Sequence, residues 1–387
     1  MSIPRSKNND YTQKMATERR RFLSDETETF LDHVGQYSMN PEVFDGNVEN
    51  FIGAAQVPIG IAGPVLVNGE HAQGEFYIPL ATTEGTLVAS YNRGMKLTRL
   101  AGGVTVHVIE DKMNRAPVFV FEDAGQARDF GIWIEQHFAE LKELAESTSS
   151  VAQLVSIEQY AASKIRWLRF NYQCGDAAGQ NMVTKATHKA FQWILSQKSE
   201  GLEYFSLAGN LDTDKKHSYI NYLHTRGKRV VAEIRIPDQF IREVMRTDAQ
   251  TLHNQRKISN VGAIMGGSVN NGAHAANGIT AMFIATGQDV ANVAESSAAI
   301  VHADVMSNGD YYFSVTIPSL IVGTYGGGTG LPTQRECLEL LGCHGKDKVF
   351  KFAEIVGAVV LSGDLSLSAA IMADEWVSSH EELGRNR

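Results

Sequence analysis

The chain has 387 residues, of which 20% are charged and 43% hydrophobic, and its formal net charge is −9. This composition is typical of a soluble globular protein, and the acidic balance argues against a nucleic-acid-binding protein, which would usually carry a basic face. The length allows two or more domains.

The cysteines and the apolar segments indicate the compartment. Three cysteines do not make a disulfide framework, and Cys337, Cys343 and His344 lack the spacing of a zinc site. We therefore expect no bound metal. The N-terminus lacks the apolar core of a secretory signal, and no stretch approaches the ~18 uninterrupted apolar residues of a membrane span. We expect a cytoplasmic protein with no nucleic-acid or membrane partner.

The N-terminal region is polar, and its pattern predicts a helix over residues 16–37. The following VPIGIAGPVLVNG has glycine and proline between apolar residues, as in tight turns between short strands.

Residues 79–90, PLATTEGTLVAS, contain one carboxylate, Glu84, flanked by the apolar Ala81 and Leu87. A poorly solvated carboxyl group has a raised pKa and can donate a proton near neutral pH. The alternative is an acid in the first turn of a helix capped by Thr82 or Thr83. Both interpretations stay open from this stretch alone.

The middle of the chain alternates between strand and helix patterns. Residues 104–108 and 117–120 predict a hairpin with Arg115 in the connection, and residues 127–146 predict a helix. A second helical run and a strand, KIRWLRFNY, lead into GDAAGQNM before another helix. Small residues at such a junction suit a phosphate, although an ordinary turn is the common case. The chain has no GxGxxG motif, so a nicotinamide cofactor would need a frame other than a Rossmann fold.

Lys215 and Lys216 follow Asp214 in a turn-rich segment that precedes a strand over residues 229–236. A lysine beside an acid, if buried, can polarise a carbonyl group or hold an oxyanion. Paired lysines on a surface turn are the common alternative.

Residues 261–300 are rich in small residues and predict a central buried helix toward their C-terminal half. Asp289 in this apolar stretch would need a buried cation, which implies a lysine partner. His274 and Asn277 share a helical face, with a hydrogen-bonded core histidine as the alternative. Gly326–Gly328 form either a flexible turn or a floor for a flat ligand. Residues 351–373 are helical, and His380 lies in a terminal tail.

Eleven short motifs follow one another along the chain: ENFIG, VPIGIAGP, PLATTEG, SYNRG, GDAAGQNM, GNLDTDKK, GAHAAN, TGQD, YGGGTGL, LSLSAA and SSH. Together, from about residue 49 to residue 380, they resemble hydroxymethylglutaryl-coenzyme A (HMG-CoA) reductase, in the soluble catalytic portion of the eukaryotic and archaeal type. The resemblance implies an α+β fold with a large substrate-binding domain (residues 48–116 and 206–387) and an N-terminal helical segment (1–47). An inserted small cofactor domain (117–205) would be ferredoxin-like and non-Rossmann. The resemblance further implies a homodimer or homotetramer with active sites at the subunit interface.

The resemblance also assigns residues to roles. Glu84 would relay a proton, Lys215 would stabilise the oxyanion, Asp289 would be a buried acid that tunes this pair, and His380 would protonate the departing thiolate. Glu84, Lys215 and Asp289 would titrate as one coupled group. The substrate-binding positions would be Arg115, Lys216, Ser90, Asn92, Arg93, Lys96, Asn277 and Lys257. The cofactor-binding positions would be Ser149, Asp176, Gly179, Gln180, Asn181, Met182, Gly326 and Gly327.

The implied reaction is the two-step reduction of HMG-CoA to mevalonate and coenzyme A by two NADPH, as in isoprenoid biosynthesis. Three positions depart from the family pattern: Ala208 replaces a serine that holds the substrate carboxylate, Ser150 an arginine suited to the 2′-phosphate, and Lys96 an arginine. NADH therefore stays open as the cofactor. A same-mechanism reductase of another acyl thioester stays open as the function, and a catalytically inactive relative is the alternative from another class.

Overall fold

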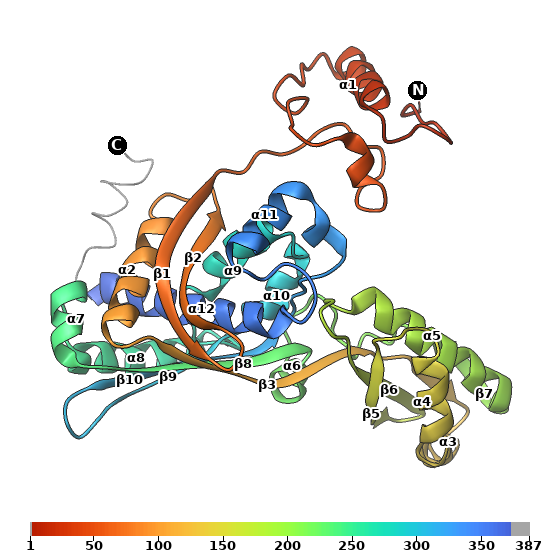
Figure 1. The fold of residues 1–387 in the computed structure, drawn as a ribbon. Coiled ribbons are helices and arrows are strands. Elements are labelled where there is room, and N and C mark those ends of the chain that lie inside the picture. Colours follow the sequence, from red (N-terminus) through yellow and green to blue (C-terminus); the bar gives the residue numbers. More distant parts are fainter. Residues whose placement is uncertain (1, 373–387) are drawn as a thin grey trace.

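The computed structural model describes residues 2–372, so the predicted His380 lies outside the described residues (Figure 1). The N-terminal segment contains α1 (Gln13–Thr27) and a short 3-10 helix, η1 (Pro41–Phe44). The helix predicted over residues 16–37 is therefore shorter and ends at Thr27, where Glu28 takes a left-handed conformation (φ 54°). Ala16, Phe44 and Phe51 form a small apolar core of this segment, which projects from the larger unit and contacts it through Leu331.

A mainly antiparallel sheet organises the larger part of the molecule. Its strands are β1 (Ile59–Gly69), β2 (Gln73–Ala81), β3 (Val104–Arg115), β8 (Gly227–Ile236), β9 (Ile300–Val305) and β10 (Tyr311–Leu320). The order β3-β8-β10-β9 is antiparallel throughout, while β1 pairs with β2 and, in parallel, with β3. The glycine and proline of IGIAGP produce a register shift between Ala62 and Val65 inside one strand, and not the predicted turns.

Helices cover this sheet, and the longest of them lies buried at the centre of the helical layer. Around α12 (Val349–Met372) lie α2 (Leu87–Leu100), α7 (Asp238–Met245), α8 (Ala249–Met265) and α9 (Ala275–Thr286). A side chain at Gly94 would lie 1.9 Å from the Ser362 carbonyl oxygen, so glycine permits the close crossing of α2 and α12.

The buried helix expected in residues 261–300 is α9. α9 lies largely buried, somewhat before the predicted position, and α12 agrees with the helix predicted over residues 351–373. By length and composition, α12 is the one described helix that could cross a membrane. However, 83% of its apolar window is buried inside the protein, as expected for a core helix.

A second group of elements forms its own core. It comprises β4 (Val118–Phe121), α3 (Ala124–Gln136), α4 (Phe138–Glu146), β5 (Gln153–Ala162), β6 (Ile165–Gln173), α5 (Gln180–Gln197) and β7 (Leu202–Ser206). The strands pair antiparallel in the order β7-β4-β6-β5, and β3 adds to β6 through residues 113–115. We call β4 to β7 the small unit. β3 therefore runs from the main sheet into the small unit (Figure 1).

Two local predictions in this region are wrong. β3 and β4 do not form a hairpin, because β6 lies between them, and Arg115 is the last residue of β3 and not part of a connection. The second helical run is the strand β5, which pairs with β6 from Gln153 to Ala162. Long-range pairing overrides the local pattern here. The strand predicted over residues 229–236 is confirmed as β8.

The remaining described elements are short or lie at the edge of the core: α6 (Tyr219–His224), η2 (Val290–Asn292), α10 (Val293–Ser296), η3 (Gly327–Gly330) and α11 (Pro332–Leu340). The protein thus has a mixed α/β fold built on antiparallel sheets.

Candidate active site

Three of the glycine-containing loops found in the sequence meet in space. A side chain at Gly287 would lie 2.3 Å from the Gly328 carbonyl oxygen. The Gln288 side-chain amide exchanges two hydrogen bonds, of 2.8 and 2.9 Å, with the backbone of Gly323. Gly323 in turn packs against Ala178 of the GDAAGQNM loop. The TGQD, GGGTG and GDAAGQNM motifs therefore form one continuous surface.

Lys215 and Asp289 form an ion pair on this surface. Lys215 Nζ lies 2.8 Å from Asp289 Oδ2, so the predicted lysine partner of Asp289 is confirmed. The prediction that this pair is buried is wrong for the single chain, because the two side chains are 43% and 39% exposed. Asp289 lies in the loop after α9, where its carboxylate accepts a hydrogen bond from the Ala291 N–H at 3.1 Å.

Buried charged side chains bind the backbone and side chains of the loop that carries Lys215. Lys215 has a left-handed backbone (φ 57°), and its N–H donates to the carboxylate of Glu295. Arg226 bridges Glu295 Oε1 (2.6 Å) and Asp214 Oδ1 (2.8 Å), and the side chains of Arg226 and Glu295 are fully buried. Burial raises the pKa of Glu295 to about 7, against the opposing effect of Arg226.

Sequence reasoning missed Glu295 and Arg226, although a signal was present. A lone carboxylate among small apolar residues needs a buried cation. That argument was applied to Asp289, but Glu295, in the same stretch, is the residue that fulfils it.

Glu84 lies in the loop between β2 and α2, and its side chain is exposed. The predicted poorly solvated position is therefore wrong in the single chain. The helix-start alternative is also wrong, because α2 begins at Leu87 with Thr86 as its N-cap residue. Asn277, on α9, donates to Glu84 Oε1 at 3.3 Å. The structure thus brings these two predicted residues together from separate elements.

The predicted substrate residues fall into two groups, one of which lies on α2. Arg93 donates to Ser366 of α12 through both its side-chain Nε (3.1 Å) and Nη2 (2.8 Å), and Ser90 Oγ lies 3.2 Å from Ser366 Oγ. Asn92 accepts from the Gly63 N–H at 3.0 Å, and Lys96 is exposed.

The other substrate group surrounds the Lys215 loop. Arg115 pairs with Asp212 at 2.7 Å, lies 3.6 Å from Asp214, and donates to Thr184 of α5 at 3.1 Å. Lys216 Nζ donates to the Asp214 carbonyl oxygen at 3.1 Å and is exposed. Arg115 and Lys216 therefore both lie beside the Lys215 loop, Arg115 as the partner of Asp212 and Lys216 with its ammonium exposed.

The predicted cofactor residues cluster at the start of α5. Gly179, left-handed (φ 88°), is the N-cap residue of this helix, and a side chain there would lie 2.5 Å from Cys174 Sγ. Gln180, Asn181 and Met182 form the first turn, and the Gln180 side chain donates to Asp214 at 3.2 Å. A helix N-terminus that opens with glycine presents free N–H groups to an anion.

Asp176 has a structural position. Its carboxylate accepts from the N–H groups of residues 347, 348 and 349 at 2.7 to 3.1 Å, which caps the start of α12. These hydrogen bonds hold the pKa of Asp176 below its usual value, although burial opposes them. Gly326 and Gly327 have positive φ, and the space where side chains would stand is open, as a ligand floor requires.

Ser149 lies near the GDAAGQNM loop, because a side chain at Gly175 would lie 2.8 Å from Val151 Cγ1. Ser149 follows α4 in the small unit, where its hydroxyl accepts from the Val151 and Ala152 N–H groups. Lys257 is exposed on α8. His274 is a buried residue at the start of α9, stacked on Tyr91 at 4.7 Å between ring centroids. The alternative of a core histidine is confirmed in its burial. The hydrogen bond expected with it is not, because neither ring nitrogen of His274 has a partner among the described residues.

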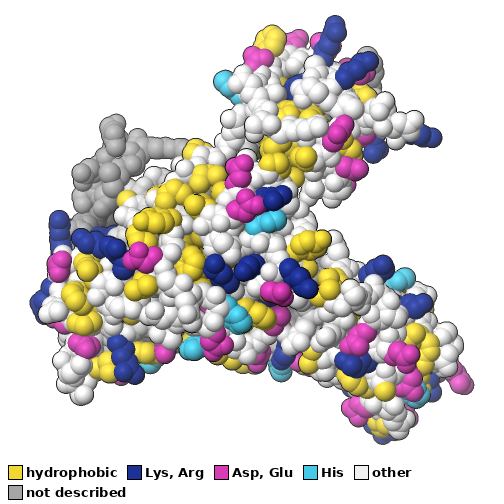
Figure 2. Space-filling model, in the orientation of Figure 1, with side chains coloured by type: hydrophobic (Ala, Val, Ile, Leu, Met, Phe, Trp, Pro, Cys, Tyr) yellow, Lys and Arg dark blue, Asp and Glu magenta, His cyan; other side chains and the backbone are white. Residues whose placement is uncertain are grey.

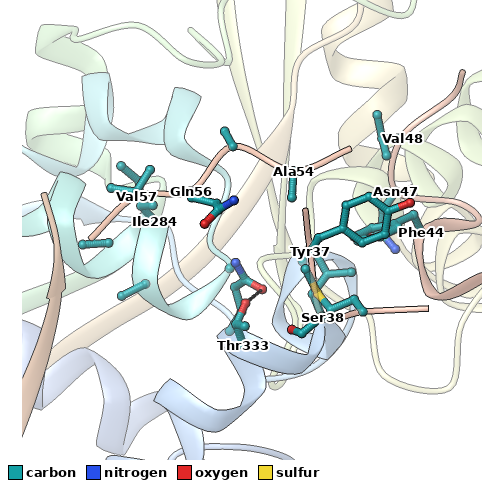
Figure 3. Close-up of a pocket in the computed structure, with 18 of the residues that line it drawn as sticks. Tyr37, Ser38, Phe44, Asn47, Val48, Ala54, Gln56, Val57, Ile284 and Thr333 are labelled. Atoms are coloured by element: carbon teal, nitrogen blue, oxygen red, sulfur yellow. Dashed lines mark hydrogen bonds between the residues drawn. The ribbon is translucent and has the colours of Figure 1, made fainter. Parts of the chain in front are cut away.

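A cavity of about 980 Å³ lies between the N-terminal segment and the TGQD and GGGTG loops (Figure 3). Tyr37, Phe44 and Asn47 of the N-terminal segment line one side, and Ile284 and Thr333, with Gln56 beside them, line the other. Asp289 is part of the same lining. The N-terminal segment therefore borders the loop that holds the ion pair.

Comparison with known proteins decides the family. The family model described as hydroxymethylglutaryl-coenzyme A reductase matches residues 15–385. The chain belongs to the HMG-CoA reductase family. Among the relatives, the HMG-CoA reductase of Methanocaldococcus jannaschii is 44% identical over 97% of this chain and 94% of that protein. The Pyrococcus horikoshii HMG-CoA reductase is 42% identical over 96% and 92%.

The fold agrees with this family. The class II HMG-CoA reductase of Streptococcus pneumoniae, solved bound to NADPH in open conformations, superposes with a TM-score of 0.67 over 92% of this chain and 96% of that one, at 21% identity. The HMG-CoA reductase of the sea urchin Strongylocentrotus purpuratus is 41% identical over 87% of this chain, but the match spans only 37% of that longer protein.

Proposed function

We propose that this protein reduces HMG-CoA to mevalonate and coenzyme A with two molecules of NADPH, the reaction that supplies mevalonate to isoprenoid biosynthesis. The observation that carries the proposal is the Lys215–Asp289 ion pair on a surface built from the TGQD, GGGTG and GDAAGQNM loops. The family name and the relatives' names support the substrate. The NADPH-bound neighbour supports the cofactor.

In this mechanism Lys215 stabilises the negative charge that each hydride transfer places on the carbonyl oxygen. Asp289, 2.8 Å away, orients the ammonium group. NADPH supplies the hydrides when it is bound. The ion pair leaves about two fifths of each side chain accessible, so the ammonium can contact a substrate oxygen.

Glu84 is proposed to supply the proton that completes the alcohol, with Asn277 orienting its carboxyl group. Closure of the site over substrate would be needed to desolvate this exposed carboxylate and to couple it with Lys215 and Asp289. His380, outside the described residues, is proposed to protonate the coenzyme A thiolate.

The substrate would be held through its anionic groups. Arg115 and Lys216 flank Lys215 and suit the hydroxymethylglutaryl carboxylate, while Ser90, Asn92, Arg93 and Lys96 of α2 suit coenzyme A. Asn277 and Lys257 are proposed on the substrate side.

The cofactor would lie against the small unit, which we propose to be a ferredoxin-like, non-Rossmann domain inserted at residues 117–205 between two parts of a large domain (48–116 and 206–387). Its support is the element order β-α-β-β-α-β, with α3 and α4 in place of one helix, and the strand order β7-β4-β6-β5. The N-terminal residues of α5, from Gly179 to Met182, suit the phosphates, and Ser149, Gly326 and Gly327 complete the set. Asp176 is proposed from the GDAAGQNM motif alone, because its carboxylate caps the start of α12.

We propose a homodimer or homotetramer in the cytoplasm, with active sites completed at the subunit interface. Exposed apolar side chains support association: Ile59, Ile61 and Tyr77 on β1 and β2 are about half exposed. Figure 2 shows hydrophobic side chains gathered over this part of the larger unit. A partner on this surface would bury residues that the single chain leaves in solvent.

Ala208 favours one second candidate, a reductase of the same mechanism with a different acyl thioester. A serine hydroxyl expected at this position is missing. However, Ser206 Oγ lies 3.3 Å from the Ala208 N and 3.4 Å from its carbonyl oxygen, so a hydroxyl remains close to that position.

Initial rates of NADPH oxidation with HMG-CoA test the function, with NADH and other acyl-coenzyme A thioesters in parallel assays. HMG-CoA with NADPH should give the highest kcat/KM. A higher value for another thioester would support the second candidate. No turnover with any thioester would favour a catalytically inactive relative.

A further inference from the structure

Among the described residues, two glutamate side chains are fully buried, Glu295 and Glu354. The contacts of Glu295 have no role in the proposed mechanism. Glu295 lies on α10, and its side chain is completely buried. The groups that face it come from three other places: Lys215 from the catalytic loop, Asn221 from α6, and Arg226 ahead of β8. The other titratable groups nearby are Asp214, Lys216, His217 and Tyr222.

The contacts of Glu295 converge on the backbone of the catalytic loop. Its Oε1 accepts from both the Lys215 N–H and Arg226 Nη1, and its Oε2 accepts from Asn221 Nδ2 at 3.2 Å. Asn221 Nδ2 also donates to Thr213 Oγ1 at 2.7 Å, two residues before Lys215. The Glu295 carboxylate therefore binds the loop directly at Lys215 and, through Asn221, at Thr213.

The loop needs such support because its backbone is strained. Asn210, Thr213 and Lys215 all have positive φ, between 51° and 61°, which is unfavourable for residues with a side chain. A hydrogen bond from the Lys215 N–H to a buried acceptor stabilises this conformation. The ammonium of Lys215 then lies 2.8 Å from Asp289 on the opposite loop.

A purely structural role does not explain the buried Glu295–Arg226 pair well, because burying charged groups costs free energy. Replacing a buried ion pair by apolar residues is often neutral or stabilising, so the pair by itself is weak evidence for a stabilising role. The raised pKa of Glu295 agrees that burial of this carboxylate is unfavourable. The specific feature is that one oxygen of Glu295 joins the lysine backbone and Arg226.

We propose that Glu295 is a positioning residue for the reduction: it accepts the Lys215 N–H, fixes the left-handed backbone at that residue, and so directs the ammonium toward Asp289 and the substrate oxygen. This inference rests on the proposed function, in which Lys215 stabilises the oxyanion. It concerns the transition state more than substrate binding. Its loss should therefore lower kcat and leave KM nearly unchanged.

The test compares Glu295→Gln and Glu295→Ala in the full-length protein with HMG-CoA and NADPH as probes. Glutamine keeps the shape and an acceptor oxygen for the Lys215 N–H, whereas alanine removes both. We expect Glu295→Ala to lose at least about tenfold in kcat, with each KM within about threefold of wild type. Glu295→Gln should recover a large part of that loss.

Glu354→Gln is the matched control. Glu354 is also fully buried, but it accepts from the N–H groups of residues 70, 71 and 72 at 2.6 to 3.1 Å, in the turn between β1 and β2. This variant should lower the melting temperature while kcat at a temperature well below melting stays close to wild type.

The outcomes separate this inference from the proposed function. An inactive wild-type protein would count against the proposed function. An active wild type with wild-type kcat in Glu295→Ala would overturn this inference alone. So would a loss of kcat no larger than in Glu354→Gln, or a rise in KM with kcat unchanged. If alanine prevents folding, Glu295→Met takes its place, because methionine keeps the volume of the side chain but offers the Lys215 N–H no oxygen acceptor. A wild-type kcat in Glu295→Met then overturns the inference as well.

Discussion

Lys215 Nζ and Asp289 Oδ2 are 2.8 Å apart, yet each side chain is about two fifths exposed. An exposed ion pair contributes only about 0–1 kcal/mol to stability. The pair is therefore better explained by chemistry than by stability. It joins two loops from distant parts of the sequence at the surface where substrate would enter.

We predict that Lys215→Ala and Asp289→Ala each lower kcat by about a hundredfold or more, because the oxyanion loses its cation or the cation loses its orientation. The melting temperature should change little. Lys164→Ala is the control, since Lys164 and Glu203 form an ion pair of similar exposure in the small unit. Steady-state rates and thermal unfolding measure both effects. Normal turnover in Lys215→Ala would remove this residue from the oxyanion role.

The junction of the TGQD and GGGTG loops gives a second prediction. A side chain at Gly328 would lie 2.7 Å from the Gly287 carbonyl oxygen, whereas one at Gly330 would meet nothing within 4 Å, and neither glycine needs a positive φ. We expect Gly328→Ala to push the loops apart, raising the KM for NADPH and lowering kcat. Gly330→Ala should behave as wild type. Equal kinetics for the two variants would show that the contact is not needed.

Ala208 gives a third prediction. Ala208→Ser restores a hydroxyl near the proposed substrate carboxylate, and a hydrogen bond to a charged group contributes about 1.5–3 kcal/mol. The KM for HMG-CoA should therefore fall by about tenfold or more, with the KM for NADPH unchanged. A rise in the KM for HMG-CoA would indicate that Ser206 already occupies this space, and Ser206→Ala in the same assay would separate the two hydroxyl groups.

His274 predicts a pH dependence of stability. Burial lowers its pKa to about 4 from an ordinary 6.5, so the folded protein binds this proton less readily than the unfolded chain. Stability should be fully present above pH ~6.5 and fall as the pH drops toward ~4, with about 2 kcal/mol lost between about pH 7.5 and pH 5. His274→Phe keeps a ring against Tyr91 but cannot titrate, so its loss of stability over this range should be smaller by that amount. Urea unfolding at the two pH values measures the difference, and an identical loss in both proteins would contradict the prediction.

Much of the fold could be read from periodicity and motif order, as for α5, α12 and β8. The strand β5 could not, because its conformation is decided by pairing with β6 and not by its own residues. Likewise, the place of Arg115 at the end of β3 depends on β6 entering between β3 and β4.

At the site, the pairing of Asp289 with a lysine was predictable, since an acid in an apolar stretch of sequence calls for a cation beside it. The exposure of Asp289 and Glu84 was not, because apolar neighbours in sequence need not be neighbours in space. The buried charge argument was sound physics applied to the wrong acid. Glu295 differs from Asp289 by lying on a short helix that turns its side chain inward to Arg226.

The course of β3 limits how this protein can be divided. Residues 113–115 complete the ladder of β6, while the preceding residues complete that of β8. A truncation that removed residues 117–205 would leave the end of β3 as an open edge, and such edges recruit strands from other molecules. An isolated small unit would conversely lose a neighbour of β6. Chimaeric proteins that exchange this unit between relatives should therefore be joined ahead of Met113, in the middle of β3. A boundary chosen from the loops alone would not fall there.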